Sequence, residues 1–489
     1  MMSNKQHLHP ITIVMNMLKN AKQWVTTFAV LFLVNIGRIE WNPAKPGFQW
    51  TLIGLLVIAV IAIVTIVLCI LSWRRFTYWF EDQELHIEKG IFVRKHQLVP
   101  FERIQSVNFK ESILHRPFRL VSVTLETAGS EESGMKLLAI SKQQAEWIEA
   151  ATKKAKKRTN TSLEATPEEQ PLVEKELMYS ITKKDLLILA ATSGSIGIIF
   201  SALAAIATQL SDFIPMDAVV DQVQVLVKSG ITLIALLVAL ILFVSWFFSI
   251  VVTYIQFANF EVVREGERLL ISKGVLEKKR TNVPLSRVQS IRIVESPFRQ
   301  LFGFATIQLV SAGNTEEKSG STVTLMPLIK RAEGIALLQK LFPDYVYDVE
   351  QWVKPPKFAS WRYMLFYSWF TFVIVALLII FIPHYYGAFG FILCVFAMLY
   401  GYVLYKTAAL QIEDNQLLVV TRTFSKVTTL VMKNRIQTLQ LAQTIVAERG
   451  ELARFQAIYV AGKLPMGVGV RFFKKVDLLR IYHWYQRGK

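Results

Sequence analysis

Five runs of apolar residues, each free of charged side chains, constrain the fold of this chain more than any other feature of its sequence. They are Leu52–Trp73, Leu186–Leu210, Gly230–Thr253, Tyr363–Ile382 and Gly387–Tyr405. About 20 helical residues at a rise of 1.5 Å per residue cross a hydrocarbon core of roughly 30 Å, so each run is long enough to span a bilayer. A shorter run, Val25–Ile36, spans only if Lys22 and Arg38 extend outward to the head groups. The sequence therefore predicts an integral membrane protein with about six transmembrane helices.

The runs come in pairs, so the predicted helices form three membrane hairpins, each followed by a long polar region. Only three of the 55 Lys and Arg residues lie in the connections within the hairpins. Because basic residues are retained on the cytoplasmic side, we expect the N-terminus and all three polar regions to be cytoplasmic, at the plasma membrane. The predicted segments are an N-terminal segment with the first hairpin (1–73), a first polar domain (74–158), a linker (159–184), a second hairpin (185–253), a second domain (254–362), a third hairpin (363–405) and a third, divergent domain (406–489).

The three polar regions repeat one sequence pattern. Arg103-Ile104-Gln105-Ser106-Val107 recurs as Arg287-Val288-Gln289-Ser290-Ile291 and as Arg435-Ile436-Gln437-Thr438-Leu439. Counted from each arginine, a leucine lies 18 residues earlier and a serine or threonine nine residues later in every copy. The polar regions are therefore three copies of one domain.

Each copy has the pattern of antiparallel strands followed by a helix. Apolar residues lie one, four and six positions after the repeated arginine, which indicates a bulge or short turn that leads into a strand. Val121, Val123 and Leu125 then alternate with polar residues, as expected for a hairpin strand, and return strands are predicted at Met135–Ile140 and Val323–Leu328. Closing helices are predicted at Lys142–Lys157, Lys330–Phe342 and Lys474–Gln486.

These residues resemble the bacterial pleckstrin-homology-like (PH-like) domain of membrane proteins. A membrane hairpin followed by G-[IV], VP-x-x-R-[IV]-Q-S-[VI] and a later A-G is that family's pattern, seen from Gly90 to Gly129 and from Gly274 to Gly313. Three units in tandem resemble the YdbT-like proteins, and Leu8-His9-Pro10 is similar to their N-terminal L-H-P. The resemblance implies cytoplasmic antiparallel β-barrels of seven strands, each closed by a C-terminal helix. It also implies a role in the cell envelope and, often, a smaller companion membrane protein with one such unit.

The third copy departs from this pattern. Arg422 stands where the first two copies have Gly90 and Gly274, Met432 replaces the proline, and Gly462 comes one residue late. We therefore expect its barrel to be altered.

The sequence lacks the motifs of the common enzyme classes, including G-x-S-x-G, H-E-x-x-H and the phosphate-binding glycine loops. The histidines show no spacing of metal ligands beyond His7 and His9, which lie on a terminus expected to be mobile. Cys69 and Cys394 each lie inside a separate apolar run. The sequence therefore predicts neither catalysis nor a metal or other cofactor.

The repeated arginine and glutamine are the candidate binding residues: Arg103, Gln105, Arg287, Gln289, Arg435 and Gln437. A guanidinium group suits phosphate oxygens because it can donate two parallel hydrogen bonds, so Arg103 and Arg287 are candidates for binding a lipid head group. The other reading is structural, with each arginine tied to Glu111 or Glu295.

The favoured function is a non-enzymatic membrane scaffold whose PH-like domains bind partner proteins or anionic lipid. Expected partners are anionic lipids and a smaller membrane protein with one PH-like unit, and a homo-oligomer is possible. The alternative is a transporter or lipid-transfer protein that uses the six-helix region. A net charge of +18 is also compatible with nucleic acid, but the basic residues alternate with acidic ones and no aromatic RNA-binding pattern is present, so nucleic acid is not expected.

Overall fold

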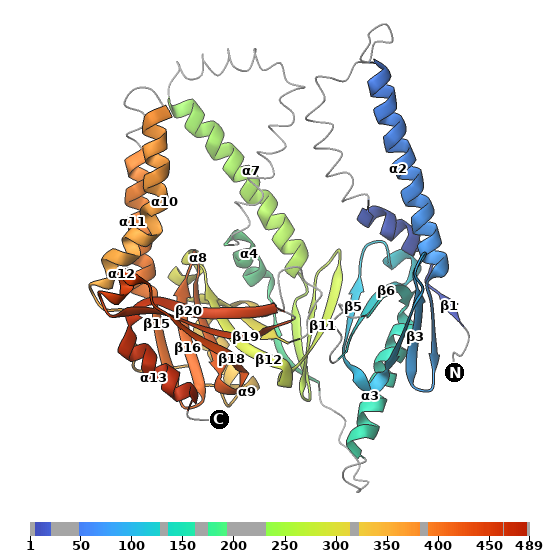
Figure 1. Ribbon diagram of the computed structural model, residues 1–489. Coiled ribbons are helices and arrows are strands. Elements are labelled where there is room, and N and C mark those ends of the chain that lie inside the picture. Colours follow the sequence, from blue (N-terminus) through green and yellow to red (C-terminus); the bar gives the residue numbers. More distant parts are fainter. Residues whose placement is uncertain are drawn as a thin grey trace. The chain divides into compact units, whose positions relative to one another are not determined.

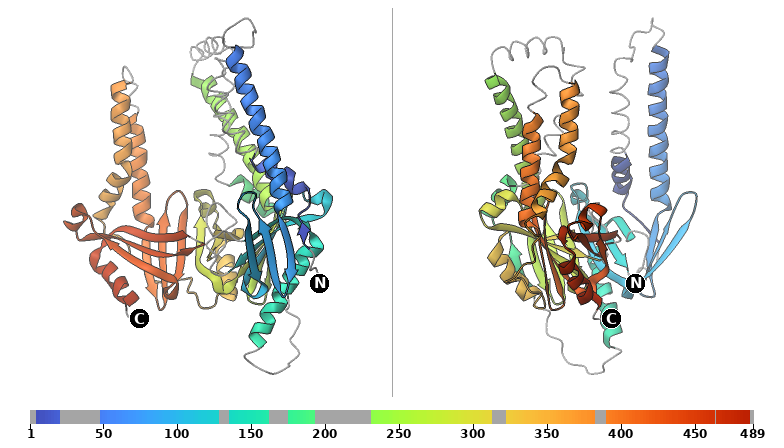
Figure 2. Two further views of the ribbon diagram at one scale, coloured as in Figure 1. Left: turned by 45° about the vertical axis from the view of Figure 1, so that its right-hand side comes forward. Right: turned by 60° about the vertical axis from the view of Figure 1, so that its left-hand side comes forward.

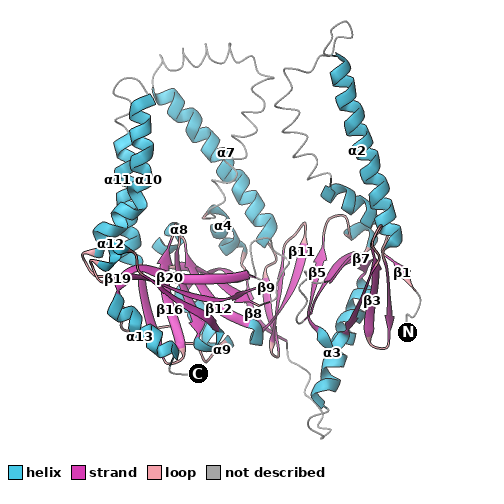
Figure 3. Cartoon of the chain, viewed as in Figure 1, coloured by secondary structure: helices cyan, strands magenta, loops and turns pink. Residues whose placement is uncertain are grey.

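A computed structural model describes residues 5–20, 48–127, 135–161, 175–192, 231–312, 322–381, 390–462 and 464–486 (Figure 1). The chain divides into two compact units. Unit 1 comprises residues 1–174, 182–261 and 270–282, and unit 2 comprises residues 175–181, 262–269 and 283–489. Each unit combines long helices with antiparallel sheets, as the colouring by secondary structure shows (Figure 3).

Long apolar helices form where the charge-free runs predicted them. These helices are α2 (Phe48–Arg75), α7 (Ile231–Phe257), α10 (Ala359–Phe381) and α11 (Gly390–Thr407). Within the described ranges, three segments are long and apolar enough to cross a membrane, Thr51–Arg75, Ala239–Phe257 and Gly390–Thr407. Of the run at Leu186–Leu210, the helix α4 (Lys183–Ala191) contains the start, whereas Val25–Ile36 lies outside the described residues.

The helices α10 and α11 of unit 2 pack closely against each other (Figure 2). Gly401 of α11 makes this possible, because a Cβ atom there would lie 2.8 Å from the Cα atom of Met364 and 2.8 Å from the carbonyl oxygen of Tyr363. Small residues at such contacts let two helix backbones approach in a membrane.

Replacing Gly401 by leucine is therefore expected to separate α10 from α11. Overpacking of this kind costs about 1–3 kcal/mol, so the variant should unfold at a lower temperature in detergent. Leu399→Ala on the same helix is a matched control, because Leu399 is 53% exposed. An unchanged unfolding temperature for Gly401→Leu would contradict the packing.

Unit 1 holds the first repeat as two sheets with a core between them. One sheet has the order β1-β2-β3-β4, formed by β1 (Gln6–His7), β2 (Thr77–Glu81), β3 (Glu84–Lys89) and β4 (Lys95–Pro100). The other contains β5 (Ile104–Glu111), β6 (Leu120–Thr127) and β7 (Met135–Ser141). Apolar side chains from both sheets and from helix α3 (Lys142–Thr161), among them Leu85, Ile104, Val123 and Ile148, are completely buried together.

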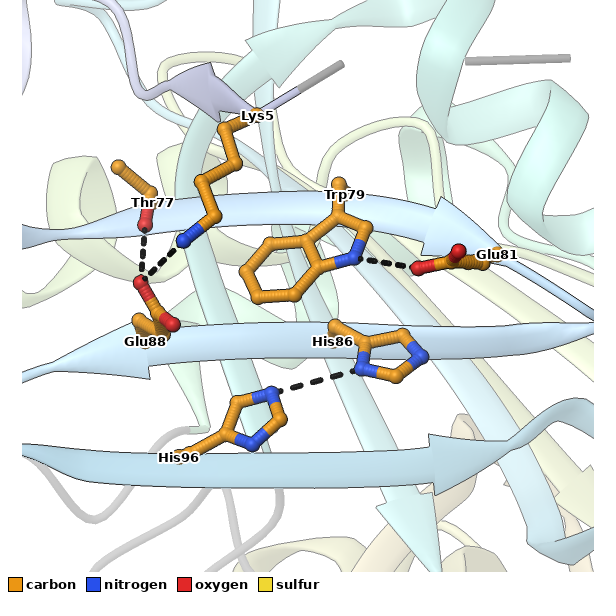
Figure 4. A network of polar contacts seen from close by, with 7 residues as sticks. All are labelled: Lys5, Thr77, Trp79, Glu81, His86, Glu88 and His96. Carbon is orange, nitrogen blue, oxygen red and sulfur yellow. Dashed lines mark hydrogen bonds and ion pairs between the residues drawn. The ribbon is translucent and has the colours of Figure 1, made fainter. Parts of the chain in front are cut away.

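The N-terminal segment belongs to this domain, so the expectation of a mobile terminus is wrong. Strand β1 pairs with β2, Leu8 is 2% exposed in the core, and its carbonyl oxygen accepts a hydrogen bond of 2.7 Å from Trp73 Nε1. At the strand's start, Lys5 forms a 2.9 Å ion pair with Glu88 and lies over the ring of Trp79, which also stacks on His86 and His96 (Figure 4).

A short strand or an isolated β-bridge precedes the membrane hairpin in every repeat. In the second repeat it is β8 (Lys175–Ser180), which lies inside the predicted linker, and its Tyr179 hydroxyl donates to the carbonyl oxygen of Leu328 at 2.6 Å. In the third repeat Val353 pairs with Leu410 through two backbone hydrogen bonds of 3.0 Å. The linker 159–184 is therefore partly structured.

The second repeat continues with β9 (Glu261–Glu265), β10 (Arg268–Lys273), β11 (Lys278–Pro284), β12 (Val288–Glu295), β13 (Phe304–Ser311), β14 (Thr322–Lys330) and α9 (Arg331–Leu341). The third contains β15 (Ala409–Glu413), β16 (Gln416–Arg422), β17 (Lys426–Met432), β18 (Ile436–Ala442), β19 (Leu452–Ala461), β20 (Leu464–Lys474) and α13 (Lys475–Gln486). The return strands and the closing helices α3, α9 and α13 lie where the sequence predicts them.

The predicted closed barrels are not found. In the part of the chain that the structure describes, each repeat splits into a first half and a second half that belong to different sheets, and the second half has three strands in every repeat. In unit 2 the larger sheet has the order β14-β13-β12-β17-β16-β15, so it joins strands of the second repeat to strands of the third. The smaller sheet has the order β18-β19-β20. The second half of one repeat thus continues into the first half of the next.

Candidate functional site

Consecutive repeats pair through their strands at two places, which we call junction 1 and junction 2. Junction 1, in unit 1, is the antiparallel pairing of β5 with β11, in which Glu111 lies opposite Lys278 and Phe109 opposite Arg280. Junction 2, in unit 2, is the antiparallel pairing of β12 with β17, in which Glu295 lies opposite Lys426 and Ser290 opposite Val431.

Both junctions have the same register. In each, the glutamate eight residues after the repeated arginine faces the lysine nine residues before the next repeated arginine. A slip of one residue would turn every side chain to the opposite face, so two identical registers indicate one rule for joining repeats.

The repeated glutamate is the electrostatic centre of junction 2. The Glu295 side chain is 7% exposed, and its carboxylate lies 3.0 Å from Lys426 Nζ and 3.4 Å from Arg331 Nη1. In junction 1 the equivalent Glu111 is 17% exposed and forms a 3.0 Å ion pair with Lys142. A buried carboxylate is stable only when it is paired, so the stability of junction 2 depends on Lys426 and Arg331.

Junction 1 adds a buried polar network of its own. The Glu126 carboxylate accepts hydrogen bonds from Ser106 Oγ at 2.7 Å and from Asn108 Nδ2 at 3.1 Å. The side-chain oxygen of Asn108 accepts from the backbone N–H of Asn282 at 2.9 Å. At the positions of Asn282 and Glu126, junction 2 has Leu430 and Val310. Because these residues differ, the two junctions are chemically distinct and mispairing would leave buried polar groups unsatisfied.

Each unit also has a groove beside its junction. The groove of unit 1 has a volume of about 460 Å³ and mixes acidic with basic side chains, including Glu111, Glu146, Lys142, Lys278 and Arg280. The groove of unit 2 has a volume of about 1090 Å³, and its lining includes Glu413, Lys433, Arg435 and Tyr485.

The predicted site residues occupy one structural position in all three repeats. Arg103, Arg287 and Arg435 each end a short 3₁₀ turn, and the strand that follows has a register shift at Gln105, Gln289 and Gln437. The extra residue of each β-bulge is therefore the repeated glutamine, and the predicted turn and bulge are confirmed.

Of the two grooves described above, that of unit 2 has a repeated arginine in its lining and that of unit 1 does not. Arg435 lies on the groove of unit 2, and its guanidinium donates to the carbonyl oxygen of Ser286 at 2.8 Å. Arg103 is exposed, and Gln289 donates to the carbonyl oxygen of Arg287 at 3.2 Å. A role of these residues in lipid binding remains a prediction.

The expected tie from the arginine to the glutamate of its own repeat is wrong. Arg287 comes just before strand β12 and Glu295 ends that strand, so about 26 Å separate them at roughly 3.3 Å per residue. Neither Arg103 nor Arg287 can reach that glutamate, which pairs instead with lysine and arginine from other elements.

Burial of tyrosine side chains predicts the alkaline limit of stability. Burial raises the pKa of Tyr78 in unit 1 and of Tyr345 in unit 2 to about 12. An unfolded tyrosine ionises near pH 10. The folded state keeps these tyrosines neutral to a higher pH, so their contribution to the free energy of unfolding is complete below pH 10 and is lost as the pH rises toward 12. Thermal unfolding between pH 8 and 11 should show this loss, with a shallower decline in Tyr78→Phe. An equal decline in both proteins would contradict the assignment.

Comparison with known proteins decides the family. A family model described as the bacterial PH domain matches residues 29–156, 186–342 and 368–489. The chain belongs to the bacterial PH domain family. Its three matches coincide with the three repeats and include most of the membrane segments.

One curated relative resembles the chain over its whole length. The UPF0699 transmembrane protein YdbT of Bacillus subtilis (strain 168) is 33% identical over 503 residues, which cover 100% of this chain and 99% of the relative. No solved structure matches the chain. This likeness over the whole length supports the assignment of the chain as a transmembrane protein.

Sequence reasoning missed the junctions, although a signal for them existed. The repeated Glu111 and Glu295 were visible, and so were Lys278 and Lys426 at a constant distance before the next arginine. The pairing itself joins residues of different repeats, so a pattern read within one repeat assigns both strands to one barrel.

Proposed function

We propose that this protein is a non-enzymatic, multi-pass scaffold of the cell membrane whose bacterial PH domains lie on the cytoplasmic side and bind partner proteins. The observation that carries the proposal is the common register of the two junctions, since a surface used twice to join repeats within the chain is suited to joining another protein with the same domain. We also propose that it acts in cell-envelope maintenance or in defence against membrane-active agents, because the chain belongs to the bacterial PH domain family.

The test is purification of the tagged full-length protein from native membranes in mild detergent, followed by identification of the retained proteins and lipids. We expect a small membrane protein with one PH domain in stoichiometric amount. Recovery of the protein without any protein partner would contradict the scaffold.

Anionic lipid is a second candidate ligand, supported by the hairpin tips near the helix ends. Strand β2 begins two residues after α2 ends, so the tip between β3 and β4 returns to the level of Arg75. At this tip Phe92 is 90% and Val93 is 71% exposed, next to the basic Arg94. In the second repeat the backbone N–H of Gly274, at the equivalent tip, donates at 2.8 Å to Ala258, the residue after α7. Exposed aromatic and basic residues at this depth suit the lipid interface.

A fluorophore attached at Phe92→Cys should therefore report an apolar environment in vesicles that contain anionic lipid. Glu102→Cys provides the matched control, because Glu102 is exposed in the turn at the opposite end of β4. A blue-shifted emission at position 92 and not at position 102 is expected, and equal emission at both would contradict lipid contact.

Transport is not favoured over the scaffold. Ionisable side chains inside a membrane usually mark a substrate pathway, and the described parts of α7, α10 and α11 place charged residues only near their ends, at Arg362 and Lys406. Substrate flux in reconstituted vesicles would overturn this preference.

A further inference from the structure

In the part of the chain that the structure describes, one strand of the acceptor type, β4, lies at the end of its sheet. At junctions 1 and 2 the acceptor strands are β11 and β17, which lie at the same place in their repeats as β4 in the first. Strand β4 ends its sheet, in the order β1-β2-β3-β4, and among the described residues no strand lies on its outer side.

Exposure along β4 agrees with an uncovered edge. Leu98 is 47% exposed, whereas the residues at its position in the covered strands, Asn282 and Leu430, are 7% and 1% exposed. Such an edge is a template for an additional strand.

The charge at this edge also matches the covered strands. The position that holds Lys278 and Lys426 holds Arg94 in the first repeat, and Arg94 is exposed. In both junctions a glutamate lies opposite this basic residue. The edge therefore has the basic residue of a junction.

The third repeat does not supply the missing glutamate. Its strand β18 is the equivalent of β5 and β12, but the position of the glutamate holds Gln443, whose Nε2 donates to the carbonyl oxygen of Leu452 at 3.1 Å. A second copy of this chain would thus offer β18 without an acidic residue opposite Arg94.

We propose that the outer edge of β4 binds the β5-type strand of a separate PH-domain protein, in the register of junctions 1 and 2, with an acidic side chain opposite Arg94 and an apolar one opposite Leu98. This inference rests on the proposed scaffold function and names its interface. Opposite charges and apolar pairs across neighbouring strands both stabilise such an addition.

A labelled peptide with the sequence of residues 286–297 is the probe, because it contains the β12 strand with its glutamate. We expect it to bind the full-length protein in detergent, and Arg94→Glu to weaken binding by about tenfold or more. A peptide with lysine in place of Glu295 should show the opposite preference and bind Arg94→Glu better than the native protein. Lys340→Glu is the control for surface charge, since Lys340 is exposed on α9.

Crosslinking shows whether the peptide binds along the β4 edge. In a protein without Cys69 and Cys394, Lys95→Cys should form a disulfide with a peptide that carries cysteine in place of Val294, its partner in the common register. If the peptide binds the wild type and Arg94→Glu equally well and forms no such disulfide, the assignment is overturned. A disulfide between Lys95→Cys and Ala442→Cys of β18 also overturns it, because this chain would then fill the edge itself.

The inference and the proposed function fail separately. If native membranes yield a one-domain partner equally with the wild type, Arg94→Glu and Leu98→Asp, the scaffold stands and the β4 edge is wrong. If the wild type retains no partner, the scaffold itself is contradicted.

Discussion

Replacing Glu295 by lysine is expected to destabilise unit 2 by about 3 kcal/mol or more. The substitution removes a carboxylate that is 7% exposed and puts a third positive charge beside Lys426 and Arg331. Breaking a buried ion pair by changing one partner typically costs about 3–5 kcal/mol. Thermal unfolding of the full-length protein in detergent measures the change.

Two variants show whether this loss belongs to junction 2. The double variant Glu295→Lys/Lys426→Glu should recover part of the stability, because opposite charges again face each other across β12 and β17. Glu333→Lys should change stability by less than about 0.5 kcal/mol, since its pair with Lys330 is 63–65% exposed. If Glu295→Lys unfolds like the wild type, the junction is not held by this glutamate.

Replacing Leu8 by aspartate should disrupt the first repeat to a similar degree. Leu8 is 2% exposed among the core residues of unit 1, and an unpaired charge in such a position costs several kcal/mol. We expect a lower unfolding temperature and rapid cleavage of the first domain by a dilute protease. The effect tests the finding that the N-terminus is a strand of the domain.

Leu8→Met and Lys5→Glu are the controls for this substitution. The first keeps an apolar side chain of similar volume and should cost less than about 1.5 kcal/mol. The second replaces the Lys5–Glu88 ion pair by two like charges, but because the two side chains are 56% and 43% exposed it should cost only about 1 kcal/mol or less. Protease resistance of Leu8→Asp equal to that of the wild type would mean that the N-terminal segment contributes nothing to the core.

Local patterns predicted much of this fold. Charge-free runs placed α2, α7, α10 and α11, because a bilayer demands apolar side chains over a known length. The repeated R-[IV]-Q-[ST] placed the 3₁₀ turn and its bulge, because both are formed by neighbouring residues.

Long-range pairing was beyond those patterns. Strands β4 and β5 follow one another, and a family pattern of seven strands favours placing them in one barrel. Strand β5 pairs with β6 on one edge, and whether its other edge pairs with β4 or with β11 depends on residues far along the chain, such as Lys278 opposite Glu111.

One shared backbone feature could not be predicted, because the residue type at its position differs between the repeats. The residue 16 positions after the repeated arginine has a left-handed backbone in all three copies, with φ of 52° at Arg119, 69° at Gly303 and 50° at Glu451. Glycine favours this conformation, yet only one copy has glycine there, so no common residue type marked the position. The candidate arginines were placed correctly at a turn, but the glutamates of the junctions were read only as their partners.

Cysteine crosslinking in native membranes is the most direct test of the claim that consecutive repeats join by strand pairing in one register. In a protein without Cys69 and Cys394, the equivalent pairs are Lys110→Cys with Lys279→Cys in junction 1 and Val294→Cys with Val427→Cys in junction 2. The controls, Lys110→Cys with Lys278→Cys and Val294→Cys with Lys426→Cys, are shifted by one residue and point to opposite faces. We predict disulfides in both equivalent pairs and little in the shifted pairs. Disulfides in the shifted pairs, or in neither set, would contradict the common register.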